Sequence, residues 1–305
     1  MGKDAFEASP AAREVFHRAE AATGLPLERL CFEGPDEELA RTNICQPAIF
    51  TVSAALLAAM AEVLGTKFPV ADFAAGLSLG EYSALYWAGA MDLESAVKLL
   101  ALRGRLMQQA AEATPSGMVS VLGLNEEKAS ELARSAGGGQ VLVCANFNCP
   151  GQIVLSGQME ACKRAEAMAK DFGASGAVAM KVAGAFHSPL MQPAAEGLEM
   201  AMRQVAFAVP RVPVIANTTA KPYRQAEELS PALLSQVVSP VRWQQSMEHL
   251  LAEGVERFYE IGPGRVLAGL MRRIHRKAEV TCIGGREAIE KLAEAVARKN
   301  VRGST

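Results

Sequence analysis

A serine between two glycines is the first pattern in this chain that could perform chemistry. The segment "GLSLG" places Gly76, Ser78 and Gly80 after an apolar stretch and before a helical one. In a G-x-S-x-G turn, small flanking residues let the backbone bend sharply, and the free N–H groups of the following helix can bind an oxyanion. A serine at this place also serves as an ordinary helix cap. The strand–turn–helix context favours the nucleophile over the cap.

A serine nucleophile needs a base, and the chain has four histidines. His17, His249 and His275 lie in helical or basic stretches that are typical of a solvated surface. His187 differs, because it follows a strand-like run and precedes a helix start with Pro189 in the first helical position. A purely structural histidine is the alternative. We take His187 as the candidate base.

An arginine lies where an apolar residue would be expected. In "LESAVKLLALRGRLMQQ", Arg103 shares a helical face with Leu99, Leu102 and Leu106, whereas Arg105 lies on the polar face. A guanidinium directed into an apolar interior requires an anionic partner. Two hypotheses stay open at this point: a structural ion pair, or a bidentate clamp for a substrate carboxylate.

The elements around these residues indicate an α/β protein. The apolar run at residues 68–78 predicts a strand that leads into the serine turn. Capping and periodicity predict the other elements of the same domain: helices at 9–24, 46–65 and 92–113, a buried helix from Glu81, strands at 212–219 and 257–262, helices from 188 and around 230 and 245, and a polar helix at 286–300.

A second pattern interrupts the first between Pro115 and His187. Strands at 118–124, 140–148, 152–157 and 177–186 alternate with two helices in the order β-α-β-β-α-β. This order is the ferredoxin-like unit. We therefore expect a small inserted domain at residues 115–187 and a discontinuous large α/β domain formed by residues 1–114 and 188–305.

Composition excludes several classes of protein. The chain has 305 residues, a formal net charge of −2 and interspersed charges, which argue against binding to nucleic acid or to a membrane surface. Six scattered cysteines without C-x-x-C spacing indicate reduced thiols and argue against a metal site. We expect no apolar run long enough to cross a membrane, no secretory signal, and a cytoplasmic protein.

Six segments taken together resemble the malonyl-CoA:acyl carrier protein transacylase family, acyltransferases of fatty acid and polyketide synthesis. They occur in order from about residue 6 to residue 285: "GLSLGEYSAL", "LRGRLMQ", "NFNCPGQIVLSG", "AFHSPLM", "SPVRW" and "EIGPGRVLAGL". The resemblance implies an α/β-hydrolase-like large domain with an inserted ferredoxin-like small domain, which agrees with the pattern of elements above.

The resemblance also implies a role for particular residues. Ser78 matches the family's nucleophile and His187 its base. The backbone carbonyl of Gln236 takes the place of a triad carboxylate in orienting the histidine ring. Arg103 pairs with the free carboxylate of the malonyl group, and the N–H of Leu79 is an oxyanion donor.

Further positions are implied with less definite roles. Phe186 resembles the bulky residue beside the histidine in family members selective for malonyl, where it crowds a methyl group at C2. Asn146 and Asn148 match a motif near the cleft without an assigned role. Leu77 stands where many members have histidine, and its side chain takes no part in the chemistry.

The mechanism that the resemblance implies is ping-pong transfer without a metal or other cofactor. Ser78 takes the malonyl group from malonyl-CoA, CoA departs, and the phosphopantetheine thiol of acyl carrier protein then removes the group from the serine. The expected partners are therefore malonyl-CoA, CoA and acyl carrier protein.

One departure from the family keeps two alternatives open. Family members begin with a strand and a Gly-Gln-Gly loop that supplies a second oxyanion donor, and no Gly-Gln-Gly occurs in this sequence. Since one donor is worth roughly 10²–10³ in rate, we expect the chain as given to be less active and less stable than a version extended upstream. The alternatives are a serine esterase or thioesterase, and a catalytically impaired homologue that binds carrier protein.

Overall fold

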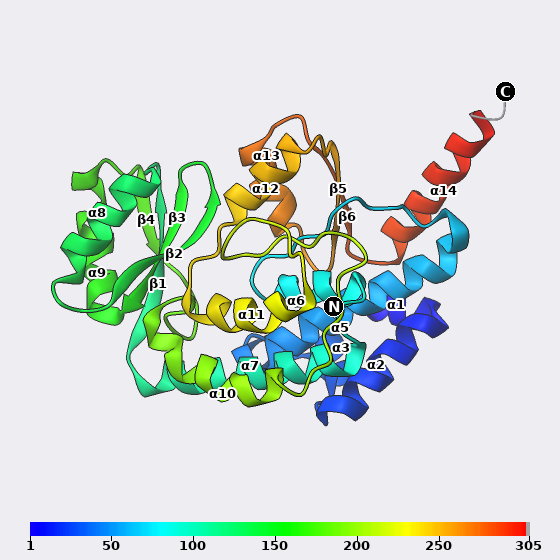
Figure 1. Cartoon of the computed structure of the whole chain (residues 1–305), viewed down its shortest axis with the longest axis horizontal. Helices are drawn as coiled ribbons and strands as arrows, with labels where there is room; N and C mark the ends of the chain where they lie inside the picture. The colour runs from blue at the N-terminus through cyan, green and yellow to red at the C-terminus, as the bar shows by residue number, and fades with distance from the viewer. Residues whose placement is uncertain (303–305) are drawn as a thin grey trace.

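A computed structural model describes residues 1–302; residues 303–305, which the predicted large domain includes, lie outside the described part. The first third of the chain is a layer of helices around one long apolar helix, α5 (Thr42–Leu64). Figure 1 shows this helix at the centre of the larger part of the molecule. It packs against α2 (Pro10–Thr23) and α7 (Leu93–Ala113), and the three share the main hydrophobic core.

The length of α5 corrects one expectation from the sequence. Together with the short 3₁₀ turn η1 (Gly65–Lys67), it is long and apolar enough, by length and composition, to cross a membrane. However, 61% of its most hydrophobic window is buried inside the protein. A helix that is apolar on all sides is expected at the centre of a large core, and this is the position of α5 here.

The small sheet has the predicted ferredoxin-like topology. Its four strands are antiparallel neighbours in the order β2-β3-β1-β4, and their bounds are β1 Ser116–Leu122, β2 Leu142–Cys149, β3 Gln152–Gln158 and β4 Gly176–Ala179. Helices α8 (Glu126–Gly137) and α9 (Met159–Met168) cover one face, at the left of Figure 1. The exact boundaries of the small domain, residues 115 and 187, stay a prediction.

The last predicted strand of this unit is shorter than expected. We predicted a strand over residues 177–186, but β4 ends at Ala179. The chain then leaves the edge of the sheet and runs as a loop to His187, which therefore does not directly follow a strand. This loop carries His187 from the edge of the small sheet to Ser78 in the large domain.

Two predicted strands of the large domain are reduced to isolated bridges. Residues 68–78 and 212–219 meet only where Ala74 pairs with Val214, and Ile215 makes one further bridge, to Pro222. Proline lacks the N–H that a ladder needs, and the sequence "VPRVPVI" contains two prolines just before the bridge. The extended sheet that we expected from these segments is absent from the described residues.

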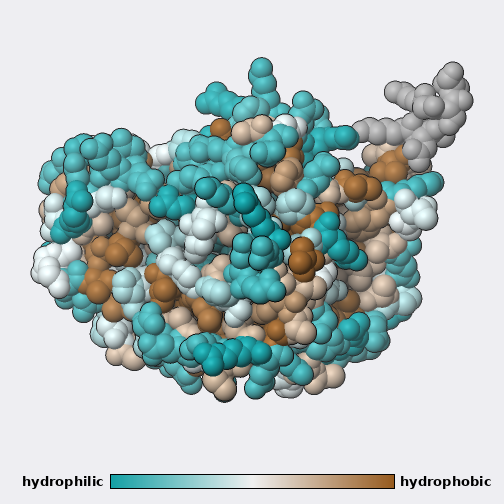
Figure 2. Space-filling model, in the orientation of Figure 1, coloured by the Kyte–Doolittle hydropathy of each residue, from teal (hydrophilic) through white to brown (hydrophobic). Residues whose placement is uncertain are grey.

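A parallel pair of strands completes the large domain. β5 (Arg257–Ile261) was predicted, whereas its partner β6 (Glu279–Ile283) and the intervening α13 (Val266–Ile274) were not. The remaining helices are α1 Lys3–Ala8, α3 Leu27–Glu33, α4 Asp36–Leu39, α6 Leu79–Trp87, α10 Gln192–Met202, α11 Leu229–Val238, α12 Trp243–Ala252 and α14 Arg286–Arg302, with 3₁₀ turns η2 Ala169–Phe172, η3 Pro189–Met191 and η4 Ala226–Glu228. Figure 2 shows hydrophilic residues over most of the viewed face, with hydrophobic residues in small separate groups.

Candidate active site

The serine turn is a sharp elbow at the start of α6. Ser78 has φ 54° and ψ −107°, a conformation that non-glycine residues rarely adopt and that is found where a site requires it. Gly76 makes the bend possible, because a Cβ there would lie 2.0 Å from the carbonyl carbon of Gly80. Gly80 itself has open space around its Cα. The first glycine of the motif is therefore the one that the geometry requires.

The side chain of Asn217, which is distant in the sequence, forms hydrogen bonds to the backbone of this elbow. Its Oδ1 accepts from the backbone N–H of Ser78 at 2.7 Å, and its Nδ2 donates to the carbonyl of Gly76 at 2.7 Å. Asn217 is buried, so its two contacts are shielded from competition with water. The strained serine is thus fixed by an amide 139 residues away.

His187 is placed to act on the serine hydroxyl. Its Nε2 lies 2.8 Å from Ser78 Oγ, and its Nδ1 lies 2.7 Å from the backbone carbonyl of Gln236. A carbonyl only accepts, so Nδ1 carries the proton and Nε2 is free to accept one from Ser78. Burial, and secondarily the positive charge of Arg103, lower the pKa of His187 to about 4. The ring is therefore a neutral acceptor at neutral pH.

The small sheet supports the loop that carries His187. Ser156 on β3 donates its hydroxyl proton to the carbonyl of Phe186 at 2.6 Å, and the hydroxyl of Ser116 on β1 accepts from the N–H of Ala185 at 3.2 Å. His187 itself has φ 55°, another left-handed value for a side-chain-bearing residue. Two serines of one sheet thus stabilise the backbone that presents the histidine in this conformation.

Arg103 lies in the interior, as its helical face indicated. Its exposed fraction is 1%, and its Nη2 lies 3.1 Å from Ser78 Oγ. Nη1 donates to Gln46 Oε1 at 2.5 Å and Nη2 to Gln236 Oε1 at 2.9 Å, so both protein partners are neutral amides. Within residues 1–302 no carboxylate lies within ion-pair distance of the guanidinium, which leaves the structural ion pair without a partner in the described chain.

The other predicted site residues also lie around the elbow. Leu79 is the first residue of α6, and its N–H has no hydrogen-bond acceptor in the part of the chain that the structure describes. Phe186 is half-buried, immediately before His187. Asn146 is buried on β2, where its backbone bridges to Val241. These placements are compatible with the predicted roles of Leu79 and Phe186, which stay predictions.

Sequence reasoning missed four polar residues that surround the site. They are Gln46, Glu81, Asn217 and Tyr223, all of them buried in the apolar interior. Glu81 carried the clearest signal, because it is a charged residue at the start of a helix that we predicted to be buried. Its carboxylate accepts from the amide of Gln236 at 2.6 Å and from the hydroxyl of Tyr223 at 2.5 Å. Burial raises the pKa of Glu81 to about 7 despite these donors.

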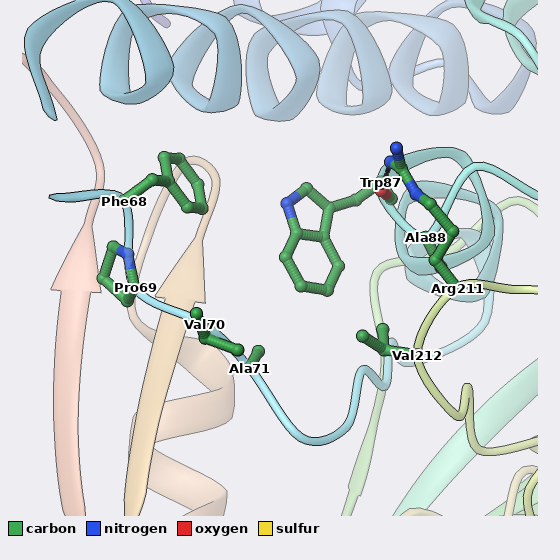
Figure 3. Close-up of a pocket in the computed structure, with 8 residues that line it drawn as sticks. All are labelled: Phe68, Pro69, Val70, Ala71, Trp87, Ala88, Arg211 and Val212. Carbon is green, nitrogen blue, oxygen red and sulfur yellow. Dashed lines mark hydrogen bonds between the residues drawn. The ribbon is translucent and has the colours of Figure 1, made fainter. Parts of the chain in front are cut away.

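Two surface hollows lie elsewhere on the protein. One, of about 210 Å³, lies between Trp87 and the segment Phe68–Ala71, and Figure 3 shows the guanidinium of Arg211 at its rim. The other, of about 360 Å³, lies where the end of the small sheet approaches Gln244. Ser78 lines neither of them. In the described residues, no group of three or more His, Cys, Asp or Glu side chains is arranged to hold a metal ion.

Comparison with known proteins agrees with this geometry. Residues 1–300 match the acyl transferase domain family. A malonyl CoA-acyl carrier protein transacylase of Bacillus subtilis is 38% identical over 301 residues, covering 98% of this chain and 94% of the relative. The enzyme of the same name from Escherichia coli K12 is 40% identical over 274 residues, covering 90% and 88%.

Solved structures of malonyl transacylases have the same fold as this chain. The malonyl CoA-acyl carrier protein transacylase of Coxiella burnetii superposes with a TM-score of 0.92 at 37% identity, covering 97% of this chain and 93% of its own. A malonyl-transacylase solved in complex with its type II PKS acyl-carrier protein superposes with a TM-score of 0.90 at 36% identity, covering 97% and 94%. The architecture is that of these enzymes, an α/β large domain with a ferredoxin-like small subdomain. The chain belongs to the acyl transferase family, among the malonyl CoA-acyl carrier protein transacylases.

Proposed function

We propose that this protein transfers the malonyl group from malonyl-CoA to the phosphopantetheine thiol of acyl carrier protein in fatty acid biosynthesis. The names of relatives at about 40% identity support both the reaction and the substrates. The neighbour solved with its own carrier protein supports direct contact between the two proteins. The enzyme is thus an acyltransferase, and neither a metal nor a redox cofactor takes part in the proposed reaction.

In the first half-reaction, Ser78 attacks the thioester carbonyl of malonyl-CoA while His187 Nε2 removes the hydroxyl proton. The 2.8 Å separation of these atoms supports this proton transfer. The tetrahedral oxyanion binds the N–H of Leu79, which has no other acceptor in the described residues. The protonated histidine then gives its proton to the departing CoA thiolate, which leaves malonyl-Ser78 and neutral His187.

The second half-reaction reverses these roles. His187 takes the proton of the phosphopantetheine thiol, and the thiolate attacks the malonyl-serine ester. The intermediate collapses with return of the proton to Ser78 Oγ, which leaves malonyl-acyl carrier protein and free enzyme. The backbone carbonyl of Gln236 holds the Nδ1 proton throughout, so that no triad carboxylate is required.

Arg103 selects an acyl group that carries a carboxylate. Its guanidinium is buried, lies beside the nucleophile and has only neutral acceptors in the described chain. A buried cation without a counter-ion is costly, and the malonyl carboxylate offsets this cost where an acetyl group does not. Phe186, beside the histidine, crowds a methyl group at C2, so malonyl-CoA is preferred over methylmalonyl-CoA.

The observation that carries this proposal is the convergence of two groups on one oxygen: Ser78 Oγ lies 2.8 Å from the base and 3.1 Å from a buried guanidinium. The test is the intact-protein mass after incubation with malonyl-CoA. We expect one malonyl adduct on the native protein and none on Ser78→Ala. An adduct that persists in Ser78→Ala would show that another residue is the nucleophile.

Adding acyl carrier protein separates this function from the two alternatives. Transfer of the malonyl group to the carrier supports the acyltransferase, whereas release of free malonate would indicate an esterase or thioesterase. Carrier binding without any adduct would indicate a catalytically impaired binding protein.

Two further assignments belong to this proposal. We place the large domain at residues 1–114 and 188–305 and the small domain at residues 115–187, with the serine on the first and the histidine at their junction. We also place the reaction in the cytoplasm, which is supported by six free cysteines in the described residues and by the absence of a disulfide among them.

A further inference from the structure

The side-chain amide of Gln236 lies between a buried cation and a buried carboxyl group. Its Nε2 donates to Glu81 Oε2 at 2.6 Å and to the carbonyl of Ser78 at 2.9 Å. Its Oε1 accepts from Arg103 Nη2 at 2.9 Å. Gln236, Glu81 and Arg103 are each only 1% exposed. The amide therefore bridges two ionisable groups that do not touch each other.

The chemistry of its neighbours fixes which way this amide points. A guanidinium only donates hydrogen bonds and a backbone carbonyl only accepts them, and Oε2 of Glu81 accepts from this amide. If the amide of Gln236 were reversed, its NH₂ would face the donors of Arg103 and its oxygen would face the acceptors of Glu81 and Ser78. In the observed orientation every contact of the amide is attractive. The shortest of its three hydrogen bonds is the one to Glu81.

This orientation matters for Arg103 and for His187 together. The oxygen of the amide holds the guanidinium next to Ser78 Oγ without neutralising its charge, because the acceptor is neutral. The backbone carbonyl of the same Gln236 accepts from His187 Nδ1. Gln236 thus contacts the carboxylate clamp through its side chain and the base through its backbone.

We propose that Glu81 is a positioning residue that acts through Gln236, aims Arg103 at the substrate carboxylate and thereby sets the preference for malonyl over uncharged acyl groups. This proposal rests on the proposed malonyl transfer. Glu81 does not touch the reacting atoms; it acts on the amide, and the amide acts on the guanidinium.

A merely structural role for Glu81 predicts something different. Glu81 also accepts from the backbone N–H of Asn217 at 3.3 Å and from the hydroxyl of Tyr223, so its loss weakens the packing under the elbow. Such weakening lowers transfer of every acyl group in proportion. A positioning role through Arg103 lowers transfer of malonyl more than transfer of acetyl. The ratio of the two therefore separates the two roles.

The variant is Glu81→Gln, which keeps the size of the side chain and an oxygen that can accept from Gln236. The measurement is kcat/KM for transfer to acyl carrier protein from malonyl-CoA and from acetyl-CoA. We expect the malonyl-to-acetyl ratio to fall roughly tenfold, within the range of coupling between contacting polar residues. The matched control is Glu260→Gln, a partly buried carboxylate that caps α13 by accepting from Leu267 and Ala268 and has no contact with Gln236. Its ratio should stay that of the native protein.

A double variant tests the route of the effect. When Arg103→Ala has already removed the clamp, adding Glu81→Gln should leave the malonyl-to-acetyl ratio unchanged. A tenfold effect that persists without Arg103 overturns the proposal, and so does an unchanged ratio in Glu81→Gln alone or an equal fall in Glu260→Gln.

A second single variant covers the case in which Glu81→Gln does not fold. Gln236→Met removes the amide but keeps the backbone carbonyl behind His187, and it should lower the ratio by the same roughly tenfold factor. An unchanged ratio in that variant overturns the proposal. The proposed function fails separately, if the native protein forms no malonyl-serine adduct.

Discussion

The small sheet and the region beneath the serine elbow are held together in different ways. In the small sheet, four strands pair in antiparallel ladders along most of their length, with two register shifts between β2 and β3. Beneath the elbow, the segments that carry Ser78 and Asn217 share a single bridge, at Ala74 and Val214. The other connections there are hydrogen bonds from the buried side chains of Asn217 and Gln236 to the backbone of the elbow.

This difference predicts which parts of the molecule are sensitive to single substitutions. A ladder distributes stability over many backbone hydrogen bonds, which side-chain changes leave in place. A side-chain contact ends when one residue is replaced, and the buried group that it served is left unsatisfied. We therefore expect small effects on catalysis from polar substitutions in the sheet and large ones around the elbow.

The largest effect is expected for His187, whose Nε2 lies 2.8 Å from the serine hydroxyl. His187→Ala should lower malonyl transfer about 10²- to 10⁴-fold, the usual contribution of general acid–base catalysis. Steady-state transfer to carrier protein measures it. His249→Ala, on α12, is the control and should stay within about twofold of the native rate, as expected for a residue outside the reaction. A fall of less than about tenfold for His187→Ala would contradict its assignment as base.

A pair of asparagines compares the two regions directly. Asn217→Ala removes both contacts that fix the elbow, and leaving buried groups unsatisfied costs about 1–3 kcal/mol. We expect at least about a tenfold loss of transfer, because a serine outside its strained conformation is not aligned with His187.

Asn125→Ala is the matched change in the small domain. Its side chain caps α8 by accepting from Lys128, and removing a cap costs about 1 kcal/mol. Thermal unfolding should register both variants, whereas transfer should fall only for Asn217→Ala. Equal losses of transfer in the two variants would remove the distinction between the regions.

A third prediction refines the comparison, because the small sheet does reach the site at one point. Ser156→Ala leaves the carbonyl of Phe186 without its partner, which is worth about 1 kcal/mol, or roughly fivefold in rate if the cost appears in the transition state. Ser120→Ala, on the neighbouring strand β1, is the control and should change the rate by less than about twofold. An unchanged rate for Ser156→Ala would mean that the loop holds its shape without the sheet.

The same contrast explains how much of the fold was predictable from the sequence. The small domain was predicted almost completely, because alternation, the Asn125 cap and the turn at Pro150 act between neighbours in the chain. The prediction of an extended strand at 68–78 was wrong, because only Ala74 pairs with another segment. The apolar pattern of these residues does not reveal that a pairing partner is missing. β6 was missed, although its equally short partner β5 was predicted.

The candidate site was predictable to a similar limit. Ser78, His187 and Arg103 each stand out locally, by a turn motif, a loop position or a charge on an apolar face, and the structure brings all three together. Asn217 and Glu81 do not stand out in this way, since their importance comes from contacts across 139 and 155 residues. Only the folded chain shows that a polar residue at the end of an expected strand meets the elbow.

The smallest effect is expected for the pH dependence of the native protein's stability, because two buried groups of the site oppose each other. The folded pKa of His187 lies at about 4, below its ordinary 6.5, so between those values the unfolded chain binds a proton that the folded chain does not. Acidification therefore destabilises the fold through His187. The folded pKa of Glu81 lies at about 7, above its ordinary 4.5, so there the folded chain keeps a proton that the unfolded chain releases. Acidification stabilises the fold through Glu81.

Between about pH 5 and 6.5 the two slopes, each about 1.4 kcal/mol per pH unit, nearly cancel. We expect the free energy of unfolding of the native protein to change by less than about 0.5 kcal/mol from these groups over that range. Glu81→Gln removes one slope, so that variant should lose about 2 kcal/mol relative to the native protein on going from pH 6.5 to pH 5. Urea unfolding at the two pH values measures the difference, and the four strands of the small sheet contain no carboxylate that could add to it. A gap between variant and native protein that does not change with pH would mean that Glu81 is ionised throughout, with Arg103 and the hydroxyl of Tyr223 stabilising its charge.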